Sequence, residues 1–519
     1  MNGHQFSRRY FFYGSLLSAA VPAALAGGNK VTLSSVGFKS PNEKLNIACI
    51  GLGMRGPQIL PGAAASENIV ALCDLDDERA APSYERYPKA NRYKDWRKML
   101  DTEGKNIDAV MVAVPDHWHT HMSLECMQRG KHVYCEKPLT RTVYEARFLN
   151  DAAAKYKVAT QMGNQGWNHE GTRTACEIFW SGEIGDVREV HAWAGPGPGD
   201  RHYPAGVPPA QPVPEGFDWD AWLGPQAARP YNADYRGWRG FIDFSTGTLG
   251  DWNVHCLGPA HLALQLDKVS PISVEAVNVE QRNAVNWPIQ SEIIYEFPAR
   301  GNMPPVTIHA YQGMRGDWKL PEGMAEGEPL LPPMGNLAKD KNRPFPETGD
   351  GQLLVGADLD ASGQVIPRGP QQTSVSGGGG RGRAGARAGA PAPPRAPSKI
   401  PGNGSLFIGT KGAMATGSRG EGVWLLPAAR WAEYRLPPQV LKRGINHQQD
   451  WIRACKGGDP GVSQFSVATK YIEWLVLGAV AVQVPGKLLW DGKNMRFTNS
   501  AEANKLIRPA ERKGWELKI

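Results

Sequence analysis

The feature that most constrains the fold is a glycine turn between an apolar strand and a helix. Residues 46–50 form an apolar run, and the segment GLGMRG, residues 51–56, follows it directly. Gly51 permits a tight turn, Gly53 lets the backbone approach a pyrophosphate, and Gly56 lets the helix pack closely on the strand. The free N–H groups at the start of the helix favour phosphate binding. The turn therefore predicts a domain that binds a dinucleotide.

A carboxylate follows the next apolar strand. Residues 69–73 are apolar, and Asp74 comes directly after them, 23 residues beyond Gly51. A carboxylate at this place can accept hydrogen bonds from ribose hydroxyls and would repel a 2′-phosphate, so it favours NAD over NADP. The alternative interpretation is a helix cap, because Asp76 and Asp77 share the same turn.

Apolar strands alternate with amphipathic segments up to about residue 165. This order indicates a parallel sheet with helices on both faces. The expected strands are 45–50, 69–73, 109–114, 132–135 and 158–162, with helices from about Arg55, through Met127, and from after Thr140 to about Lys155. We therefore predict a Rossmann domain of the α/β class over residues 45–165.

Longer strand-like runs follow from residue 187 onward. They occur at 187–193, 272–279, 292–297, 306–311 and 405–408, with helices expected at 170–180, 447–456 and 466–484. Residues 166–519 are therefore predicted to form an α+β domain with a large, mainly antiparallel sheet, which serves substrate binding and oligomerisation. Because such an open sheet can pair face to face, we expect a homo-oligomer.

Two segments stand outside these domains. Residues 1–26 contain Arg8 and Arg9, then an apolar run and a small-residue cleavage site, which resembles a twin-arginine (Tat) export signal. The alternatives are an uncleaved anchor and a fortuitous basic and apolar start. Residues 27–44 read as a linker. The Gly/Arg/Pro-rich stretch of about 369–399 cannot bury a core and is predicted to be a disordered insertion. The leader predicts a periplasmic or secreted protein that engages the Tat machinery.

Charge and cysteine content exclude several classes of function. The formal net charge is +7, but the excess lies in the leader and the insertion, so the remainder is nearly neutral and nucleic-acid binding loses its support. The seven cysteines are scattered without a C-x-x-C pair, so they read as buried hydrophobic residues rather than a zinc or disulfide site. No uninterrupted 18-residue apolar run follows the leader, so no stable membrane span is expected.

A lysine lies just beyond the strand at 132–135. Glu136-Lys137-Pro138 follows this strand, and Pro138 bars a helix there. Lys137 can therefore project into the cleft at the carboxyl edge of the sheet, where open α/β folds bind ligands. A solvated loop lysine is the alternative.

A second candidate pair is Asp251 and His255. They are four residues apart, so a helix that starts near Gly250 would present both on one face. An imidazole titrates in the range needed for proton exchange, and a nearby carboxylate can orient it. A capping aspartate and a packed histidine are the alternative.

Together, the glycine turn, the E-K-P segment and the D-x-x-x-H pair resemble the Gfo/Idh/MocA family of sugar and polyol oxidoreductases. The resemblance covers about residue 45 to the C-terminus without the insertion, and it is most specific in the first 140 residues. It implies Lys137, Asp251 and His255 as catalytic residues, with His255 exchanging the hydroxyl proton of a carbohydrate. Two positions depart from the pattern: Asn253 replaces a common glycine and Gly258 replaces a common acid.

The cofactor contacts follow from the turn and from the resemblance. They are expected at Gly51, Gly53, Met54, Arg55, Gly56, Asp74, Pro115, His117, His119, Glu136, Lys137 and Gln165. The alternation of His117, His119 and His121 suggests a metal site. These residues enter a helix, however, where the side chains of residues i and i+2 do not converge. No metal is therefore expected.

Three functions remain open. An exported enzyme has no free dinucleotide pool, so NAD must stay bound and be regenerated within each cycle. The favoured function is an oxidoreductase acting on the CH–OH group of a sugar or sugar derivative. The alternatives are a redox-neutral NAD-dependent glycosidase, which oxidises, eliminates, hydrates and reduces one substrate, and a non-catalytic carbohydrate-binding protein.

Overall fold

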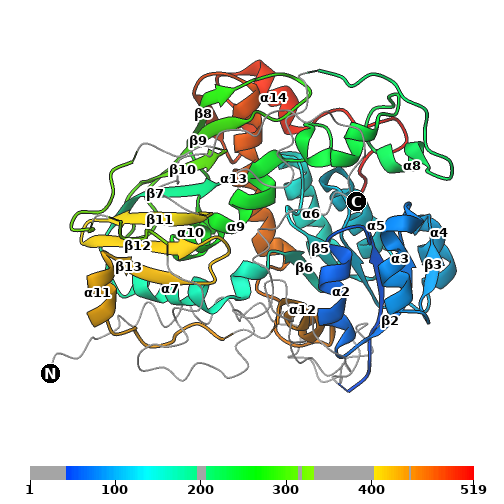
Figure 1. The fold of residues 1–519 in the computed structure, drawn as a ribbon, viewed down its shortest axis with the longest axis horizontal. Coiled ribbons are helices and arrows are strands. Elements are labelled where there is room, and N and C mark those ends of the chain that lie inside the picture. The colour runs from blue at the N-terminus through cyan, green and yellow to red at the C-terminus, as the bar shows by residue number, and fades with distance from the viewer. Residues whose placement is uncertain (1–41, 196–205, 314–317, 326, 332–401, 444–445) are drawn as a thin grey trace, which may run out of the picture.

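The computed structural model describes residues 42–195, 206–313, 318–325, 327–331, 402–443 and 446–519 (Figure 1). The predicted leader, most of the linker and the Gly/Arg/Pro insertion lie outside the described residues.

The N-terminal part is built on a six-stranded parallel sheet in the order β3-β2-β1-β4-β5-β6. Its strands are β1 (Asn46–Ile50), β2 (Asn68–Cys73), β3 (Asn91–Tyr93), β4 (Ala109–Val112), β5 (His132–Glu136) and β6 (Thr160–Gly163). Its helices are α2 (Gly56–Ala64), α3 (Asp77–Arg86), α4 (Trp96–Glu103), α5 (Asp116–Gln128) and α6 (Val143–Tyr156). Strands β4 and β5 are buried at every residue, as a sheet covered on both faces requires. The predicted Rossmann fold is confirmed.

The segment between β2 and β4 holds elements that the sequence analysis left out. Helix α3 is mostly polar and begins at the side-chain cap Asp76, while β3 has only three residues, two of them exposed. Elements this short and polar carry little apolar periodicity, which is why their pattern was weak.

The C-terminal part is built on a nine-stranded sheet in the order β13-β12-β11-β7-β10-β9-β8-β14-β15. Its strands are β7 (Val187–Ala194), β8 (Ser273–Glu280), β9 (Gln290–Phe297), β10 (Val306–Gln312), β11 (Gly404–Gly409), β12 (Gly412–Gly417), β13 (Val423–Leu426), β14 (Leu488–Asp491) and β15 (Arg496–Phe497). Only β7 and β10 pair in parallel among its described pairs. The prediction of a mainly antiparallel sheet is confirmed.

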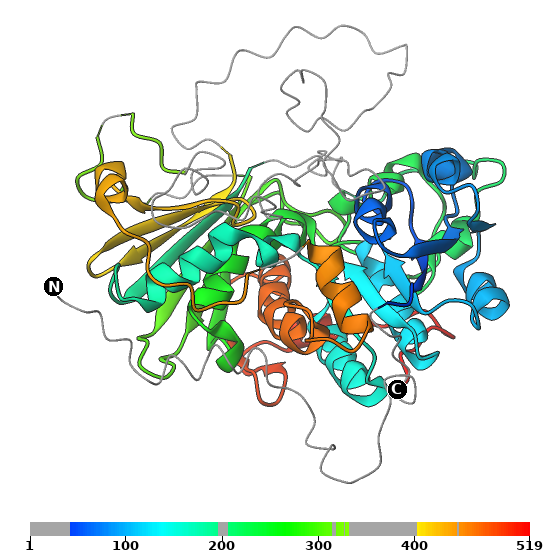
Figure 2. The same ribbon diagram turned by 90° about the horizontal axis from the view of Figure 1, so that it is seen from below.

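Helices cover one face of this sheet (Figure 2). The helices after β6 are α7 (Glu170–Trp180), α8 (Trp219–Leu223), α9 (Val254–Cys256), α10 (Gly258–Ala263), α11 (Ala428–Glu433), α12 (His447–Cys455), α13 (Phe465–Gln483) and α14 (Ala501–Ile507). Helix α13 is long and apolar enough to cross a membrane by composition, but most of it is buried against α6, β8 and β9. It is therefore a core helix, as the sequence analysis expected.

The chain returns late to the Rossmann part. Helix α12 packs on α2, and Trp451 lies fully buried in one apolar cluster with Ile47 and Leu72. Helix α13 packs on α6, where Arg147 forms an ion pair with Glu473 at 2.7 Å. Figure 1 shows α13 between the two sheets. The two sheets therefore share one continuous interior.

Candidate active site

The strand order reverses between β1 and β4, which is where an open α/β sheet binds its ligand. Gly51 lies there with φ +90°, and a Cβ on it would come within 2.3 Å of the Ala113 carbonyl oxygen. A Cβ on Gly56 would lie 2.0 Å from the Gly51 carbonyl oxygen. Neither glycine can carry a side chain without moving the backbone, so the turn is built as predicted.

Asp74 is fixed at the carboxyl end of β2. Its carboxylate accepts hydrogen bonds from the Leu52 N–H at 2.6 Å and the Asp76 N–H at 2.9 Å. Burial raises the pKa of Asp74 from its ordinary value, although these two bonds act in the opposite direction. The cap of α3 is Asp76, whose side chain accepts from the Arg79 N–H. The capping interpretation of Asp74 is therefore wrong.

The residues around the turn fit NAD. Asp74 uses one lone pair on each oxygen, so further lone pairs remain for ribose hydroxyls. Met54, beside the turn, is 50% exposed. At the end of β6, the side-chain oxygen of Gln165 is buried without a hydrogen-bond partner among the described residues. Pro115 begins α5 beside the turn.

Arg55 and Glu136 join the glycine turn to the end of β5. The Arg55 Nε lies 3.0 Å from a Glu136 oxygen. Burial would lower the pKa of Arg55, but the charge of Glu136 outweighs it and raises that pKa. Both residues were predicted as cofactor contacts, and the structure shows that they fix each other beside the glycine turn.

Lys137 is held in place by Asp251. Its ammonium donates to the Asp251 carboxylate at 2.6 Å and to the Asp251 carbonyl at 2.7 Å. Only 12% of the Lys137 side chain is exposed, so the solvated-lysine alternative is wrong. Arg239 lies 3.2 Å from the second carboxylate oxygen. Burial would raise the pKa of Asp251, but Arg239 and Lys137 outweigh it and hold that pKa below its usual range.

His255 is oriented by an amide instead of the expected carboxylate. Its Nδ1 lies 2.7 Å from the Asn164 side-chain oxygen. The chain at Asp251 forms a π-helical turn, Leu249–Asn253, before α9 begins, and Asp251 faces the two cations. The expectation that a regular helix would let Asp251 orient His255 is therefore corrected: charge attraction draws the carboxylate to Lys137 and Arg239.

The hydrogen bonds of Asn164 fix the tautomer of His255. The Asn164 amide nitrogen donates to the Val254 carbonyl at 2.8 Å, so its oxygen faces the imidazole. An oxygen acceptor requires the proton on Nδ1, which leaves a lone pair on Nε2. Burial, together with the charges of Lys137 and Arg419, lowers the pKa of His255 well below its ordinary value. The ring is therefore neutral, with one nitrogen able to accept a proton.

His117 and His119 are buried in the wall beside β4. The Nε2 of His117 donates to the Trp222 carbonyl at 3.0 Å, and burial lowers the pKa of His117 to about 3. Both nitrogens of His119 face carbonyl oxygens, of Pro138 at 2.7 Å and of Val114 at 2.9 Å.

Two carbonyl acceptors require two N–H donors, so the His119 ring is protonated. Burial opposes this charge, but Cys135, Asp116 and the Pro138 carbonyl act in the other direction and raise the pKa of His119 to about 10. His119 thus fixes the loop that carries Lys137, while contact of either histidine with the cofactor stays a prediction.

Three site residues escaped the sequence analysis: Asn164, Arg239 and Arg419. Arg419 comes from the loop between β12 and β13 and lies over the Trp252 ring, 4.8 Å from its centroid. Arg239 lies in a 3-10 helical segment, Ala233–Gly240, and Arg419 lies in a loop, and neither belongs to a recognisable motif. Asn164 directly follows β6, and the carboxyl end of a parallel strand was the one signal that could have indicated it.

The two departures from the family pattern have structural roles. Asn253 is buried and donates to the Tyr311 carbonyl at 3.2 Å, which ties the π-helical turn to β10. A Cβ on Gly258 would lie 2.8 Å from the Trp167 indole nitrogen, so this position has no room for an acidic side chain.

Comparison with known proteins identifies both domains. Residues 45–164 match the domain described as "Oxidoreductase family, NAD-binding Rossmann fold", and residues 205–299 match "Oxidoreductase family, C-terminal alpha/beta domain". The cofactor of the Rossmann domain is accordingly NAD, in agreement with the fit described above.

Curated relatives align with part of the chain. A glycosyl hydrolase family 109 protein of Solibacter usitatus is 28% identical over 162 residues, 29% of this chain and 37% of that protein. An inositol 2-dehydrogenase of Salmonella typhimurium is 27% identical over 176 residues, 33% of this chain and 49% of that protein. The chain thus spans less than half the length of either relative.

The fold is also found in solved structures. The WlbA dehydrogenase of Bordetella pertussis, solved with NADH and UDP-GlcNAcA, superposes with a TM-score of 0.51 at 12% identity, covering 86% of this chain and 99% of that one. This likeness concerns the fold alone. With the two matched domains in this order along one chain, the protein belongs to the Gfo/Idh/MocA oxidoreductase family.

Proposed function

We propose that the protein is an NAD-dependent oxidoreductase that acts on a CH–OH group of a sugar or polyol. The observation that carries the proposal is the unprotonated Nε2 of a buried His255 in the same site as the fixed ammonium of Lys137. Bound NAD would supply the acceptor for the hydride of the carbinol carbon. His255 accepts the hydroxyl proton at Nε2, and Lys137 donates a hydrogen bond to the same oxygen.

The surrounding charges suit this division of roles. The Nδ1–H of His255 donates to Asn164 both before and after proton transfer, so the ring need not turn. Asp251 offsets the charges of Lys137 and Arg239, which limits their opposition to protonation of His255. A neutral base and a fixed donor are the two groups that removal of a hydroxyl proton requires.

The substrate class rests on the relatives. The family description names an NAD-binding oxidoreductase, and a relative named inositol 2-dehydrogenase favours a polyol or sugar as substrate. A screen of sugars and polyols against the protein with bound NAD should give a substrate that changes the nicotinamide absorbance. Lys137→Ala and His255→Ala should each lower this rate by about 10²-fold or more, and the exposed Lys89→Ala is the matched control. Unchanged turnover in either site variant would contradict the catalytic assignment.

A second candidate is a redox-neutral glycosidase, which is favoured by the relative named as a glycosyl hydrolase family 109 protein. In this scheme one glycoside is oxidised, loses its aglycone by elimination, gains water and is reduced again, so NAD is restored in each cycle. It predicts aglycone release without an external acceptor and uptake of deuterium from heavy water at a substrate carbon. A substrate oxidised without either effect would favour the simple oxidoreductase.

Export and assembly form a separate part of the proposal. The paired Arg8 and Arg9 support transport by the Tat machinery, after which NAD would remain as a resident group. Arg8→Lys with Arg9→Lys should retain the protein in the cytoplasm of the producing cell. The protein purified without added cofactor should contain NAD, and sedimentation should show a homo-oligomer. Loss of NAD on gel filtration would contradict its residence.

A further inference from the structure

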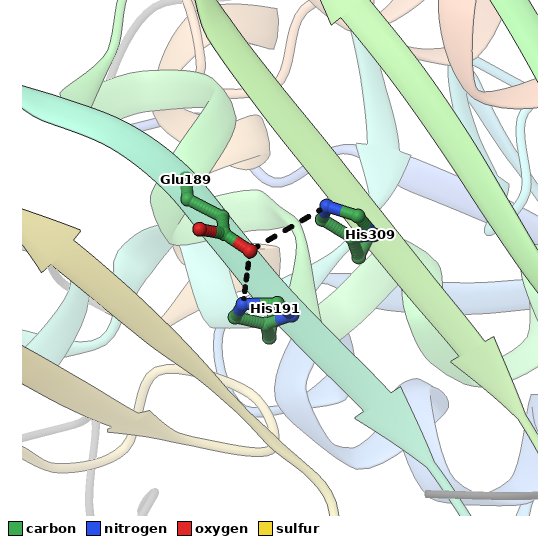
Figure 3. A group of neighbouring side chains, drawn as sticks. All are labelled: Glu189, His191 and His309. Carbon is green, nitrogen blue, oxygen red and sulfur yellow. Dashed lines mark ion pairs between the residues drawn. The ribbon is translucent and has the colours of Figure 1, made fainter. Parts of the chain in front are cut away.

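A cluster of two histidines and a glutamate lies on the sheet face opposite the helices. Along β7, Val190 and Ala192 belong to the apolar core, so the alternating Glu189 and His191 point to the other face. His309 of β10 pairs directly with His191 in the parallel register and shares that face. Figure 3 shows the three side chains converging from the two strands.

The donor atoms of Glu189, His191 and His309 are spaced much like the ligand atoms of a metal site. One Glu189 oxygen lies 2.9 Å from the His191 Nε2 and 3.7 Å from the His309 Nε2, and the donor atoms of the three residues all lie within 4.8 Å of one another. Bonds of about 2.0–2.2 Å around one Zn²⁺ place neighbouring ligand atoms about 3–3.5 Å apart. A small movement of the three side chains would bring all three donor atoms within bonding distance of one ion.

Outer partners orient both imidazoles. The His309 Nδ1 lies 2.8 Å from a Glu292 oxygen, and the His191 Nδ1 lies 3.0 Å from the Tyr311 hydroxyl. In metal sites, a ligating histidine bonds through its second nitrogen to such a group, which fixes the tautomer and the ring. Here both bonds use Nδ1, so both Nε2 atoms face Glu189.

The His191 Nε2 lacks a hydrogen bond in this arrangement. His191 is 2% exposed, and its Nε2 is buried without a hydrogen-bond partner among the described residues, although the Glu189 oxygen lies close. Trp318 stacks on the ring at 5.0 Å between centroids. A buried imidazole nitrogen that lies beside a carboxylate can serve with it as a metal ligand.

We propose that Glu189, His191 and His309 bind a divalent transition-metal ion, with Zn²⁺ as the best match to two imidazoles and one carboxylate. Glu189 is 45% exposed, so a water or an external ligand can complete the coordination. Imidazole ligands disfavour Ca²⁺ and Mg²⁺, which prefer oxygen. The ion joins β7 to β10, the parallel pair at the centre of the sheet. This site is independent of the proposed redox chemistry.

The test is metal content and affinity. Protein without a histidine tag is stripped with a chelator, dialysed against Zn²⁺ and analysed for zinc per chain. We expect one bound ion in the wild type and in Glu275→Gln, a control on β8 of the same sheet. Glu189→Gln and His309→Gln should bind at least about 10-fold more weakly, and Glu292→Gln should also weaken binding, as loss of an outer partner does.

A second measurement, the melting temperature, distinguishes the loss of a zinc ligand from misfolding of the variant. Zn²⁺ should raise the melting temperature of the wild type and of Glu275→Gln but not of Glu189→Gln, whose melting temperature without zinc should match the wild type. Wild-type protein that binds no zinc at stoichiometric concentration would overturn the proposal. Equal zinc binding by the wild type, Glu189→Gln and His309→Gln would overturn it as well.

Discussion

At the residue scale, the central feature of the site is one carboxylate between two cations. Asp251 contacts both Lys137 and Arg239, and they keep its pKa low despite burial. Asp251→Asn would leave the positive charges of Lys137 and Arg239 without their counter-charge, and it would keep the bond of the Lys137 ammonium to the backbone carbonyl but weaken its bond to the side chain. We expect kcat/KM on the substrate to fall by about 10²–10³-fold. Asp243→Asn, which breaks the ion pair with Arg229 away from the site, is the control and should leave kcat/KM unchanged.

The amide beside His255 allows a sharper prediction about pH. Asn164→Asp places a carboxylate against Nδ1, which stabilises the protonated ring and raises the pKa of His255. Because the base must be neutral, the acidic limb of the kcat/KM profile should move to higher pH, by about one unit or more. The profile of Asn164→Ser, which lacks the charge, is the comparison. An acidic limb that stays in place would show that His255 is not the base.

The sequence anticipated some of these residues and not others. Lys137 and His255 lie in motifs whose chemistry can be interpreted locally, and the structure places them close enough for the charge of Lys137 to act on His255. Arg239 reaches the site from the 3-10 helix Ala233–Gly240 and Arg419 from a loop, and their contacts depend on the packing of distant segments. No local pattern encodes such contacts.

At the element scale, strands and helices with strong apolar patterns were predicted within a few residues, and helix α7 was predicted with its observed bounds. The hairpin of β12 and β13 was missed, because Gly412 and Gly417 bound a short run that resembles a loop. The π-helical turn at Leu249–Asn253 was also missed, since it depends on the contacts of Asp251 and Asn253 with other elements.

The strand–turn–helix at Gly51 gives a prediction with a close control. Gly51→Ala and Gly182→Ala both place a Cβ on a glycine with positive φ, +90° and +78°. At Gly182 nothing lies within 4 Å of the added atom, whereas at Gly51 it meets the Ala113 carbonyl oxygen at 2.3 Å.

We therefore expect Gly182→Ala to cost about 1–2 kcal/mol of unfolding free energy. Gly51→Ala should cost more and also weaken NAD retention, because β1 and β4 must separate. Urea unfolding and the NAD content of purified protein measure both effects. Equal destabilisation with NAD fully retained would show that the turn tolerates a side chain.

At the scale of the whole molecule, stability depends on histidines that are buried without charge. Burial lowers the pKa values of His117, His132 and His261 to about 3, 4 and 4. The unfolded chain has histidine pKa values of about 6.5. Each of these histidines therefore stabilises the folded protein above about pH 6.5. This contribution is lost as the pH falls toward the pKa that the histidine has in the folded state. His119, with a raised pKa, acts oppositely and loses its contribution as pH rises from about 6.5 to about 10.

The unfolding free energy should therefore be greatest near neutral pH and fall on both sides. His132 is the best group to isolate, because its Nδ1 accepts from the Ala159 N–H at 2.9 Å and a glutamine oxygen can replace it. His132→Gln should reduce the slope between pH 6 and 4.5 by up to about 1.4 kcal/mol per pH unit, while the alkaline side stays unchanged because it depends on His119. Urea titrations across this range measure the slope. If the unfolding free energies of the wild type and of His132→Gln fell with the same slope as the pH is lowered, His132 would not be a buried neutral histidine.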